Sequence, residues 1–388
     1  MGLSKHKAKN QSFEFSIIMW FRYGAWTILT VALSLLSSGK CEAQNSLEFT
    51  SISGVKVTSP GKYLLGGKTY GFEVAYNMSQ TKRFDEWIKR LSVRDIAIVG
   101  GYRNMNNVYI KDSIDSKGFL GSVYTLSARL NVKLLSFKKT EILLTGSTGL
   151  VYSGSSYFTD GNPIIGTRLN FLPQGGIKIR TPLSGSTALV AGAETFHYSN
   201  IGFQVPNSGV DAIQVTLGIT KDLKNAEKET TLRKVDKVRG FVDIGTDIGR
   251  RGSNKSHKGS WKSGLYAGYN YKLNQAFSVK AGMDAVYYYT AYDNTNDTFQ
   301  YLATSYDPWR LGVSLGGDLW LGKLIIMGNV GYYLKFNSVY PVKIYEVAGF
   351  KYYVNSSLGV QAKMYFNSAQ ADYFGAGLVF RIPTQNYK

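Results

Sequence analysis

The chain has 388 residues, a formal net charge of +19 and a single cysteine. Such a basic balance suggests polyanionic partners, and nucleic acid is the usual candidate. Here the basic residues are dispersed among aromatic residues and glycines, which argues against a nucleic-acid-binding protein.

The N-terminus has the pattern of a secretory signal peptide. Residues 25–37 form an apolar segment too short to span a bilayer. It is preceded by four basic residues, Lys5, Lys7, Lys9 and Arg22. The small side chain of Ala43 suits cleavage after that residue. We therefore expect residues 1–43 to be removed, leaving a mature chain of residues 44–388 with no cysteine for disulfides or thiolate chemistry. For an exported basic chain, phosphorylated lipid or lipopolysaccharide is a better partner than nucleic acid.

The mature chain lacks an apolar run of the ~18 residues that a spanning helix needs. It consists instead of segments of about ten residues, rich in Tyr, Val, Leu, Gly and Thr, separated by polar loops, which is the pattern of a transmembrane β-barrel. The 28 tyrosines, 20 phenylalanines and 42 glycines fit aromatic girdles and close strand packing. A soluble β-sandwich is the alternative, but the strands are too many and too long. We predict an all-β fold, an antiparallel transmembrane β-barrel of the outer membrane.

The expected strands of the first half, in chain order, are 68–77, 93–101, 119–136, 141–152, 164–181, 186–198 and 210–222. Those of the second half are 237–250, 258–272, 276–290, 308–320, 323–336, 343–353, 356–366 and 371–382. The prediction is about 14 strands (12–16), reaching 16 if residues 48–58 pair and one further segment splits. Short turns alternate with longer loops, as in outer-membrane barrels, and this places the C-terminus in the periplasm and the 199–209 loop outside.

Two charged connections on the periplasmic side, 78–92 and 223–236, are long enough for a short helix. The second separates a part that carries the candidate site, 44–222, from additional barrel strands, 237–388. Either all strands form one larger barrel, or eight form a barrel and the rest packs elsewhere. We favour one larger barrel, because the second part is itself rich in strands and no linker of flexible composition precedes it.

Residues 186–222 combine two strand-like runs with a polar loop between them. Because side chains alternate along a strand, His197 and Ser199 point to the same side. On the returning run, Asp211 shares a face with apolar residues, namely Ile213, Val215 and Leu217. A serine, a histidine and a carboxylate therefore gather on the apolar face of a hairpin, just below its loop.

These residue types are the ones that nucleophilic acyl transfer requires. An imidazole takes the proton of the serine hydroxyl, and a carboxylate fixes the imidazole tautomer and stabilises the imidazolium. An amide donor such as Asn207 can stabilise the oxyanion. An isolated His-x-Ser pair in a strand is, however, usually structural, because such a triad is defined by geometry and not by spacing.

The extended motif HYSNIGFQVPNSGVD resembles the active-site hairpin of the lipid A 3-O-deacylases (the PagL type), which are outer-membrane β-barrel esterases. The resemblance is specific over residues 186–222 and looser over the other strands. It implies that His197 is the base, Ser199 the nucleophile and Asn207 an oxyanion donor. The acid of the family is typically a glutamate, whereas this chain has Asp211, whose side chain reaches one methylene less far. Asn200 is adjacent and could support the same oxyanion hole.

We therefore predict an esterase that removes an ester-linked (3-hydroxy)acyl chain from lipid A or lipopolysaccharide in the outer membrane, without a cofactor or a metal. The alternatives are a non-enzymatic barrel of the porin or adhesion type, and a phospholipase-type esterase. The other two histidines, His6 and His257, lie in the leader and in a basic loop. Asp293 and Asp297 stand in a loop that lacks the EF-hand pattern for calcium. Whether the protein is a monomer or a dimer stays open.

Overall fold

The structure is a computed structural model, and it describes residues 45–60, 63–80, 85–111, 113, 118–223, 237–252, 259–291, 305–338, 342–367 and 370–386. The expected signal peptide, the basic loop around His257 and the loop with Asp293 and Asp297 lie outside these residues.

The first half of the chain forms a closed barrel of eight antiparallel strands, in the order β1-β10-β9-β8-β7-β6-β4-β3. The strands are β1 (Ser46–Thr58), β3 (Thr69–Ser79), β4 (Val93–Asn104), β6 (Ser122–Phe137), β7 (Thr140–Ser153), β8 (Leu169–Ser184), β9 (Thr187–Tyr198) and β10 (Val210–Asp222). Two short strands, β2 (Leu65–Gly66) and β5 (Tyr109–Ile110), pair with each other in a separate sheet. We call this the first barrel.

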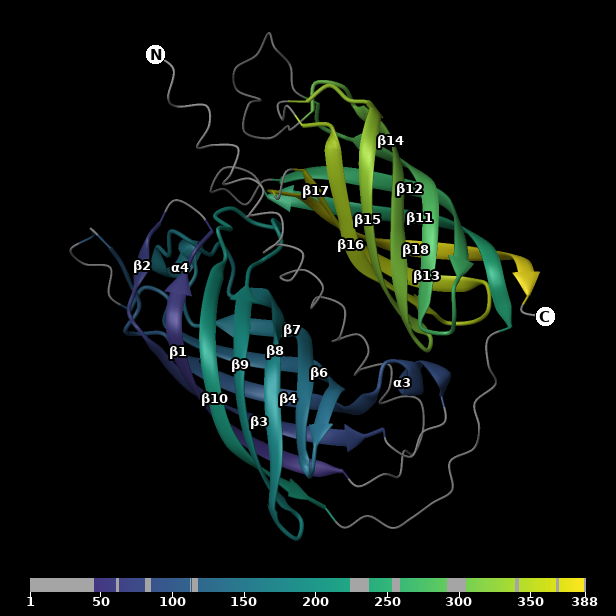
Figure 1. Ribbon diagram of the computed structural model, residues 1–388. Helices are drawn as coiled ribbons and strands as arrows, with labels where there is room; N and C mark the ends of the chain where they lie inside the picture. Colours follow the sequence, from purple (N-terminus) through teal and green to yellow (C-terminus); the bar gives the residue numbers. More distant parts are fainter. Residues whose placement is uncertain are drawn as a thin grey trace, which may run out of the picture.

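The second half forms another closed barrel of eight strands, each paired with its neighbours in chain order, and β11 pairs with β18 to close it. The strands are β11 (Val238–Gly252), β12 (Gly259–Lys272), β13 (Phe277–Tyr288), β14 (Trp309–Leu321), β15 (Leu324–Lys335), β16 (Ile344–Tyr353), β17 (Leu358–Asn367) and β18 (Gln370–Asn386). We call this the second barrel. Figure 1 shows the two barrels as separate bodies.

The prediction of a single larger barrel is therefore wrong. Residues 48–58 do form a strand, β1, and this strand pairs on both sides within the first half, with β3 and with β10. Both edges of the first eight strands are thereby satisfied, so no edge remains to which the second half could add. The fold class of an antiparallel membrane β-barrel holds for each half.

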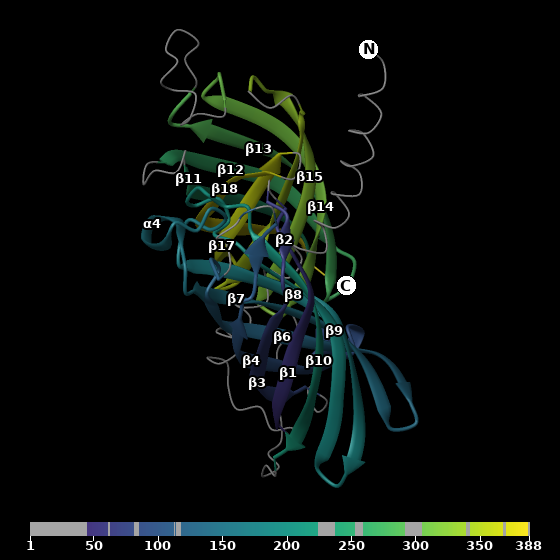
Figure 2. The ribbon, with the colours of Figure 1, turned by 90° about the vertical axis from the view of Figure 1, so that its left-hand side faces the viewer.

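The ribbon turned by 90° shows the strands of both barrels from another side (Figure 2). Side chains alternate along these strands, with apolar residues on the outer wall and polar residues inside. On β10 the exposed residues include Ile213, Val215, Leu217 and Ile219, whereas the buried ones include Gln214, Thr216 and Thr220. On β14 the exposed residues are Leu311, Val313 and Leu315, and the buried ones include Arg310, Ser314 and Asp318. Apolar outside and polar inside is the reverse of a soluble protein and is the pattern of a barrel in lipid.

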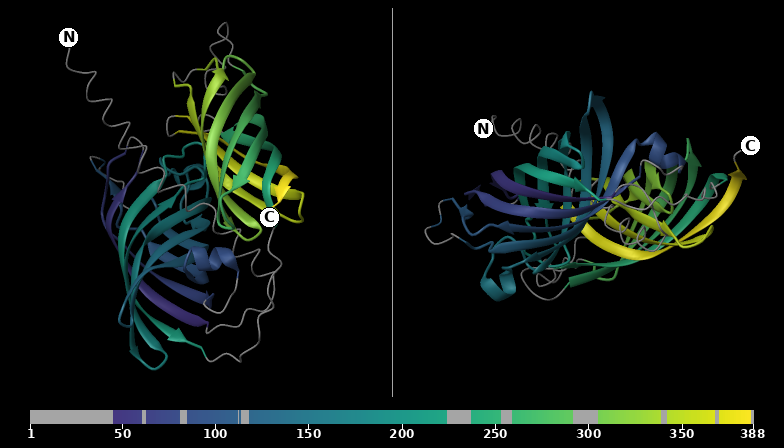
Figure 3. Two further views of the ribbon diagram at one scale, coloured as in Figure 1. Left: turned by 45° about the vertical axis from the view of Figure 1, so that its right-hand side comes forward. Right: turned by 90° about the horizontal axis from the view of Figure 1, so that it is seen from below.

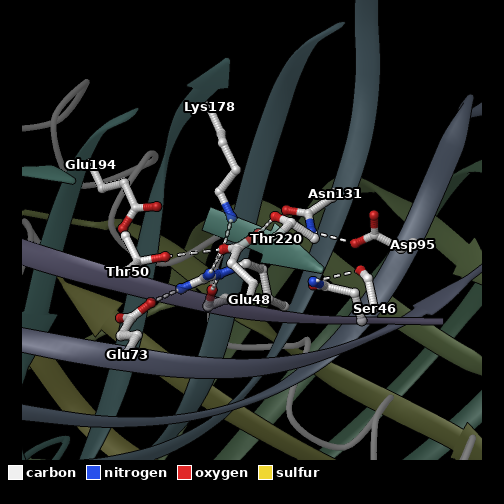
Figure 4. A network of polar contacts seen from close by, with 12 residues as sticks. Ser46, Glu48, Thr50, Glu73, Asp95, Asn131, Lys178, Glu194 and Thr220 are labelled. Carbon is white, nitrogen blue, oxygen red and sulfur yellow. Dashed lines mark hydrogen bonds and ion pairs between the residues drawn. The ribbon is translucent and has the colours of Figure 1, made fainter. Parts of the chain in front are cut away.

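The interior of each barrel is filled with paired charges. In the first, Lys178 donates to Glu48 at 2.6 Å (Figure 4). Arg103 and Arg129 both pair with Glu73. In the second, separate clusters form, in which Lys262 pairs with Asp372 and Lys280 with Asp318, each at 2.6 Å. Buried charges are tolerated here because each named charge has an opposite partner.

The ends of the first barrel differ. Three of its longer connections, between β4 and β6, β7 and β8, and β9 and β10, lie at one end, which we call the loop end. The tight turns at 138–139 and 185–186 lie at the other, the turn end, together with the longer connection between β3 and β4. A short helix, α4 (Tyr157–Asp160), lies at the loop end, and another, α3 (Glu86–Arg90), at the turn end. α3 falls within the connection 78–92, where the sequence allows a short helix; 224–236 lies outside the described residues.

The two barrels lie side by side (Figures 1 and 3). The turn end of the first contacts the tight β14–β15 turn of the second, and the loop end of the first contacts the end of β11. At the turn end, Trp87 and Ile88 of α3 pack in one cluster with Leu321 and Leu324 of the second barrel. At the loop end, the Gly252 N–H at the end of β11 donates to the Gly202 carbonyl in the loop between β9 and β10, at 2.8 Å. Because like ends meet, both barrels can cross one membrane in the same orientation.

Within the described residues, no helix is long and apolar enough to cross a membrane.

Candidate active site

The hairpin of β9 and β10 brings His197 and Asp211 together. The two residues stand directly opposite each other in the antiparallel register, so their side chains leave the sheet on the same face. The Nδ1 atom of His197 lies 2.7 Å from Oδ1 of Asp211. The aspartate side chain, although one methylene shorter than the glutamate typical of the family, thus reaches the imidazole, because the two residues lie directly opposite each other on adjacent strands.

This face is the outer wall of the first barrel. It is shared with Ile213 and Val215, which are about half exposed, whereas His197 is only 6% exposed. The imidazole is shielded because the chain from Ser199 to Gly209 folds over the end of the hairpin. The site therefore lies on the lipid side of the wall and is covered from above by its own loop.

An ionised carboxylate can only accept a hydrogen bond, so the pair with Asp211 places the imidazole proton on Nδ1 of His197. The other ring nitrogen, Nε2, is buried and has no hydrogen-bond partner among the described residues. Nε2 then carries the lone pair. This is the tautomer in which a histidine can accept a proton from a hydroxyl.

Ser199 lies at the start of the loop, held by the neighbouring strand. Its N–H donates to the Phe171 carbonyl at 3.2 Å, and its carbonyl accepts from the Phe171 N–H at 2.9 Å. Gly209, at the end of the loop, has a positive φ of 73°. A Cβ atom added to Gly209 would lie 2.6 Å from Cε1 and 3.3 Å from Nε2 of His197, and 3.5 Å from Cβ of Ser199. The imidazole and Ser199 thus border the same small space, which only a glycine leaves open.

Asn207 is held in the loop through its side-chain oxygen and its backbone. Its Oδ1 accepts the N–H of Asn200 at 2.8 Å, and its backbone forms an isolated bridge with Ile165. With the oxygen used in this way, the NH₂ group is the end of the side chain that can donate to a ligand.

Asn200 has a different position from the one expected. Its Nδ2 donates to the Gln204 carbonyl at 2.7 Å, and its Oδ1 accepts the Gln204 N–H at 3.4 Å. Both ends of the side chain therefore hold the loop. Its backbone N–H orients Asn207, so the structure favours a positioning role for Asn200.

Three neighbours of the site were missed by reasoning from the sequence. Phe171 and Ile165 come from elsewhere in the chain, and the Ser59 hydroxyl, from the region after β1, donates to the Gly209 carbonyl at 2.8 Å. No local pattern marks these residues. Gly209 could have been found, since a glycine at the end of a polar loop often marks a backbone with positive φ.

An apolar cluster fills the loop end of the first barrel directly behind the hairpin. It contains the buried inward-facing residues Phe196, Tyr198, Val210 and Ala212, together with Val57, Leu65, Met105, Val108, Leu120, Val123, Val151, Ile164, Ile165 and Leu172. The cluster gives the hairpin a rigid backing. It also separates the candidate site on the outer wall from the charged interior. Among the described residues, no group of three or more His, Cys, Asp or Glu side chains could hold a metal ion.

Two closed barrels with apolar outer walls define an integral outer-membrane β-barrel protein. Residues 70–220 match the family model described as Lipid A 3-O-deacylase (PagL), and residues 240–385 match the one described as Acyloxyacyl hydrolase, C-terminal domain. The chain belongs to this family of lipid A deacylases, which are hydrolases of the outer membrane. One match falls on each barrel.

Similar solved structures include the outer-membrane enzyme PagL, at 14% identity and a TM-score of 0.30, covering 44% of this chain and 97% of that one. A mutant of the Rhodopseudomonas blastica porin is 11% identical with a TM-score of 0.18, covering 88% and 99%. CdiB from Acinetobacter baumannii is 10% identical with a TM-score of 0.19, covering 88% and 60%. No curated protein matches the chain.

Proposed function

We propose that the chain is exported through a signal peptide to a Gram-negative type outer membrane, and that it hydrolyses an ester-linked (3-hydroxy)acyl chain of lipid A. The observation that carries this proposal is the His197–Asp211 pair on the lipid side of the barrel wall, with the unpartnered Nε2 of His197 and Ser199 bordering the same space beside Gly209. The family match supports the substrate class.

In the proposed first step, Oγ of Ser199 attacks the acyl carbonyl while Nε2 of His197 takes its proton. Asp211 stabilises the imidazolium that forms. The oxyanion of the tetrahedral intermediate accepts a hydrogen bond from the NH₂ group of Asn207. As the intermediate collapses, the sugar hydroxyl leaves with the proton from His197, and the acyl chain stays on Ser199 as an ester.

In the second step, water attacks this ester and His197 takes one of its protons. The intermediate collapses, the proton returns to Oγ of Ser199, and the hydroxy fatty acid leaves. Every atom of the acyl group and of the water is accounted for by these two steps, without a cofactor. A deep aqueous pocket is not needed, because the substrate reaches the site by lateral diffusion in the leaflet.

The position of the site agrees with a substrate in the outer leaflet. His197 and Asp211 stand at the loop end of β9 and β10, and longer loops are typical of the external side of outer-membrane barrels. The ester bonds of lipid A lie just below its sugars. A nucleophile near the external end of the outer wall is therefore at the depth of the bond it is proposed to cut.

Mass spectrometry of lipopolysaccharide incubated with the detergent-solubilised protein tests the proposal, with Ser199→Ala in parallel. We expect the wild type to release one hydroxyacyl mass, and Ser199→Ala to be slower by at least about 10³-fold. Fragmentation then locates the cleaved position. Hydrolysis of phospholipid with lipopolysaccharide intact would point to a phospholipase-type esterase. If both lipids stay intact, the chain is a non-enzymatic barrel.

A further inference from the structure

The second barrel contacts the loop that covers the candidate site. The Gly252 N–H at the end of β11 donates to the Gly202 carbonyl at 2.8 Å, and the Arg250 guanidinium lies 5.1 Å from the centre of the Phe203 ring. A Cβ atom added to Gly252 would lie 2.6 Å from Cα of Gln204. Gln204 is the residue to which both ends of the Asn200 side chain are bonded. The end of β11, at the rim of the second barrel, is thus in close contact with residues 202–204, and Gln204 holds the Asn200 side chain beside Asn207.

Just below this rim, the outer wall of the second barrel begins beside the candidate nucleophile. Ile201, two residues after Ser199, packs in a buried cluster with Met364 and Phe366 of β17. Phe171, whose backbone is paired with Ser199, has its ring centre 6.1 Å from that of Phe374 on β18. An acyl group bound to Ser199 would therefore have the wall of the second barrel as its neighbour.

This wall contains an apolar hollow. Apart from Lys363, its lining is apolar and consists of Ala348, Gly349, Phe350, Ala362, Met364, Phe366 and Phe374. Phe366 and Phe374 belong to the cluster with Ile201 at the loop end, whereas Phe350 packs against the cluster with Trp87 at the turn end. The hollow thus lies between the two places where the barrels touch, at the depth of the hydrocarbon.

The apolar rings of Phe171 and Phe374 lie between Ser199 and this hollow, since Phe171 pairs with Ser199 and Phe374 lines the hollow. Lipid acyl chains descend from the leaflet surface toward the middle of the membrane. An acyl chain with its ester at Ser199 would run in the same direction past these rings, and the apolar lining matches its chemistry.

We propose that the second barrel forms one side of the substrate site: its rim holds the loop 199–209, and its hollow receives the acyl chain that is cleaved. The proposal rests on the esterase function proposed above. It gives the second barrel a part in the reaction, although the proposed reacting groups all belong to the first.

Filling the hollow tests the acyl-chain part. Ala362→Phe places a ring in it, and Ala281→Phe, on the exposed outer wall of β13, is the matched control. The substrates are nitrophenyl esters with a short and a long acyl chain, in mixed micelles. We expect Ala362→Phe to lower the ratio of kcat/KM for long over short esters by about tenfold or more. A filled hollow excludes the long acyl chain but does not affect binding of the ester group itself. The control should keep the wild-type ratio.

An unchanged ratio in Ala362→Phe, or an equal loss on both esters, would overturn the acyl-chain part, because damage to the fold affects both substrates alike. If Ala281→Phe also loses the long-chain preference, the loss reflects how the protein interacts with the micelle and not the hollow. This result would also overturn the acyl-chain part.

Disturbing the rim tests the loop part. Gly252→Ala pushes on Gln204, whereas Gly100→Ala is its control, because a Cβ atom added there has nothing within 4 Å. We expect Gly252→Ala to lower kcat on the short ester about tenfold or more with KM little changed, and to slow labelling of Ser199 by a fluorophosphonate. Heat-modifiable gel mobility should show that both variants keep a folded barrel.

Wild-type values in Gly252→Ala would overturn the role of the rim. A fall in kcat together with lost heat-modifiable mobility would show general damage and would overturn it too. If the wild type cleaves neither ester nor lipopolysaccharide, the proposed function itself fails. If the wild type is active and both test variants match their controls, only the inference about the second barrel fails.

Discussion

The two barrels have the same architecture but differ in where their polar side chains reach the outer wall. Each has eight antiparallel strands, an apolar outer wall and a charged interior. Only the first carries a histidine among its described residues, and that histidine stands on the outer wall with a carboxylate opposite it. A polar pair that faces lipid costs free energy, so its presence suggests a function. This feature distinguishes the hairpin of β9 and β10 from the other strands.

The polar groups in the interiors of the barrels, in contrast, do not mark a functional site. Buried charged groups often mark a functional site, and both interiors contain them. Glu73 is held by Arg103 and Arg129 in the first barrel, and Asp372 is held by Lys262 and Arg310 in the second. Both barrels have such clusters, whereas among the described residues only the first has the histidine pair. We therefore interpret the clusters as the packing of narrow barrels.

The largest expected effect separates the outer wall from the interior. Asp211→Asn should lower kcat of ester hydrolysis by about 10⁴-fold, because an amide no longer holds the imidazole in the required tautomer. The barrel should remain equally stable. Asp211→Glu, which restores the usual acid of the family, should keep far more activity than the asparagine variant. Steady-state kinetics with a soluble ester measures both.

Equal losses for Asp211→Asn and Asp211→Glu would argue that the position needs this one geometry and not a carboxylate as such. Full activity in Asp211→Asn would break the distinction between the barrels, since the outer-wall pair would then be structural.

The second prediction concerns the interiors. Glu73→Gln in the first barrel and Asp372→Asn in the second should each lower the free energy of unfolding by about 3–5 kcal/mol, because two cations lose their counterion in a buried place. Urea unfolding of the protein in lipid or detergent micelles measures the loss. A large effect in one barrel only would show that the two interiors have different roles.

The pairing of His197 with Asp211 could be predicted from the sequence because it is local. The two residues belong to one hairpin, and the period of two along a strand fixes which side chains share a face. The apolar residues that follow Asp211, Ile213 and Val215, mark that face as the outer one. The closure into two barrels could not be predicted in this way, since it depends on whether β1 meets β10 or the last strand, a pairing between distant segments.

Contacts between distant segments also explain why several neighbours of the site could not be predicted from the sequence. Asn200 is next to Ser199 in sequence, but the path of the loop turns its side chain toward Gln204. Phe171 reaches Ser199 from the preceding strand, and Gly252 and Phe374 come from the other barrel. Positions set by contacts between distant segments leave no periodic pattern in the sequence, whereas the alternation within one hairpin does.

The smallest expected effect tests whether both barrels cross the membrane. Leu217 lies near the middle of β10 and Leu315 in the middle of β14, and both are more than half exposed on the outer wall, at 56% and 69%. Leu217→Arg and Leu315→Arg should each lower stability in bilayers by about 2–4 kcal/mol, because a cation replaces an apolar side chain near the bilayer midplane. Unfolding of the protein in vesicles measures both, and the same variants in detergent with a polar surface should lose less. If Leu315→Arg costs nothing while Leu217→Arg costs the full amount, only the first barrel spans the bilayer. The hollow on β16, β17 and β18 would then lie outside the hydrocarbon, and an acyl chain would have no reason to enter it.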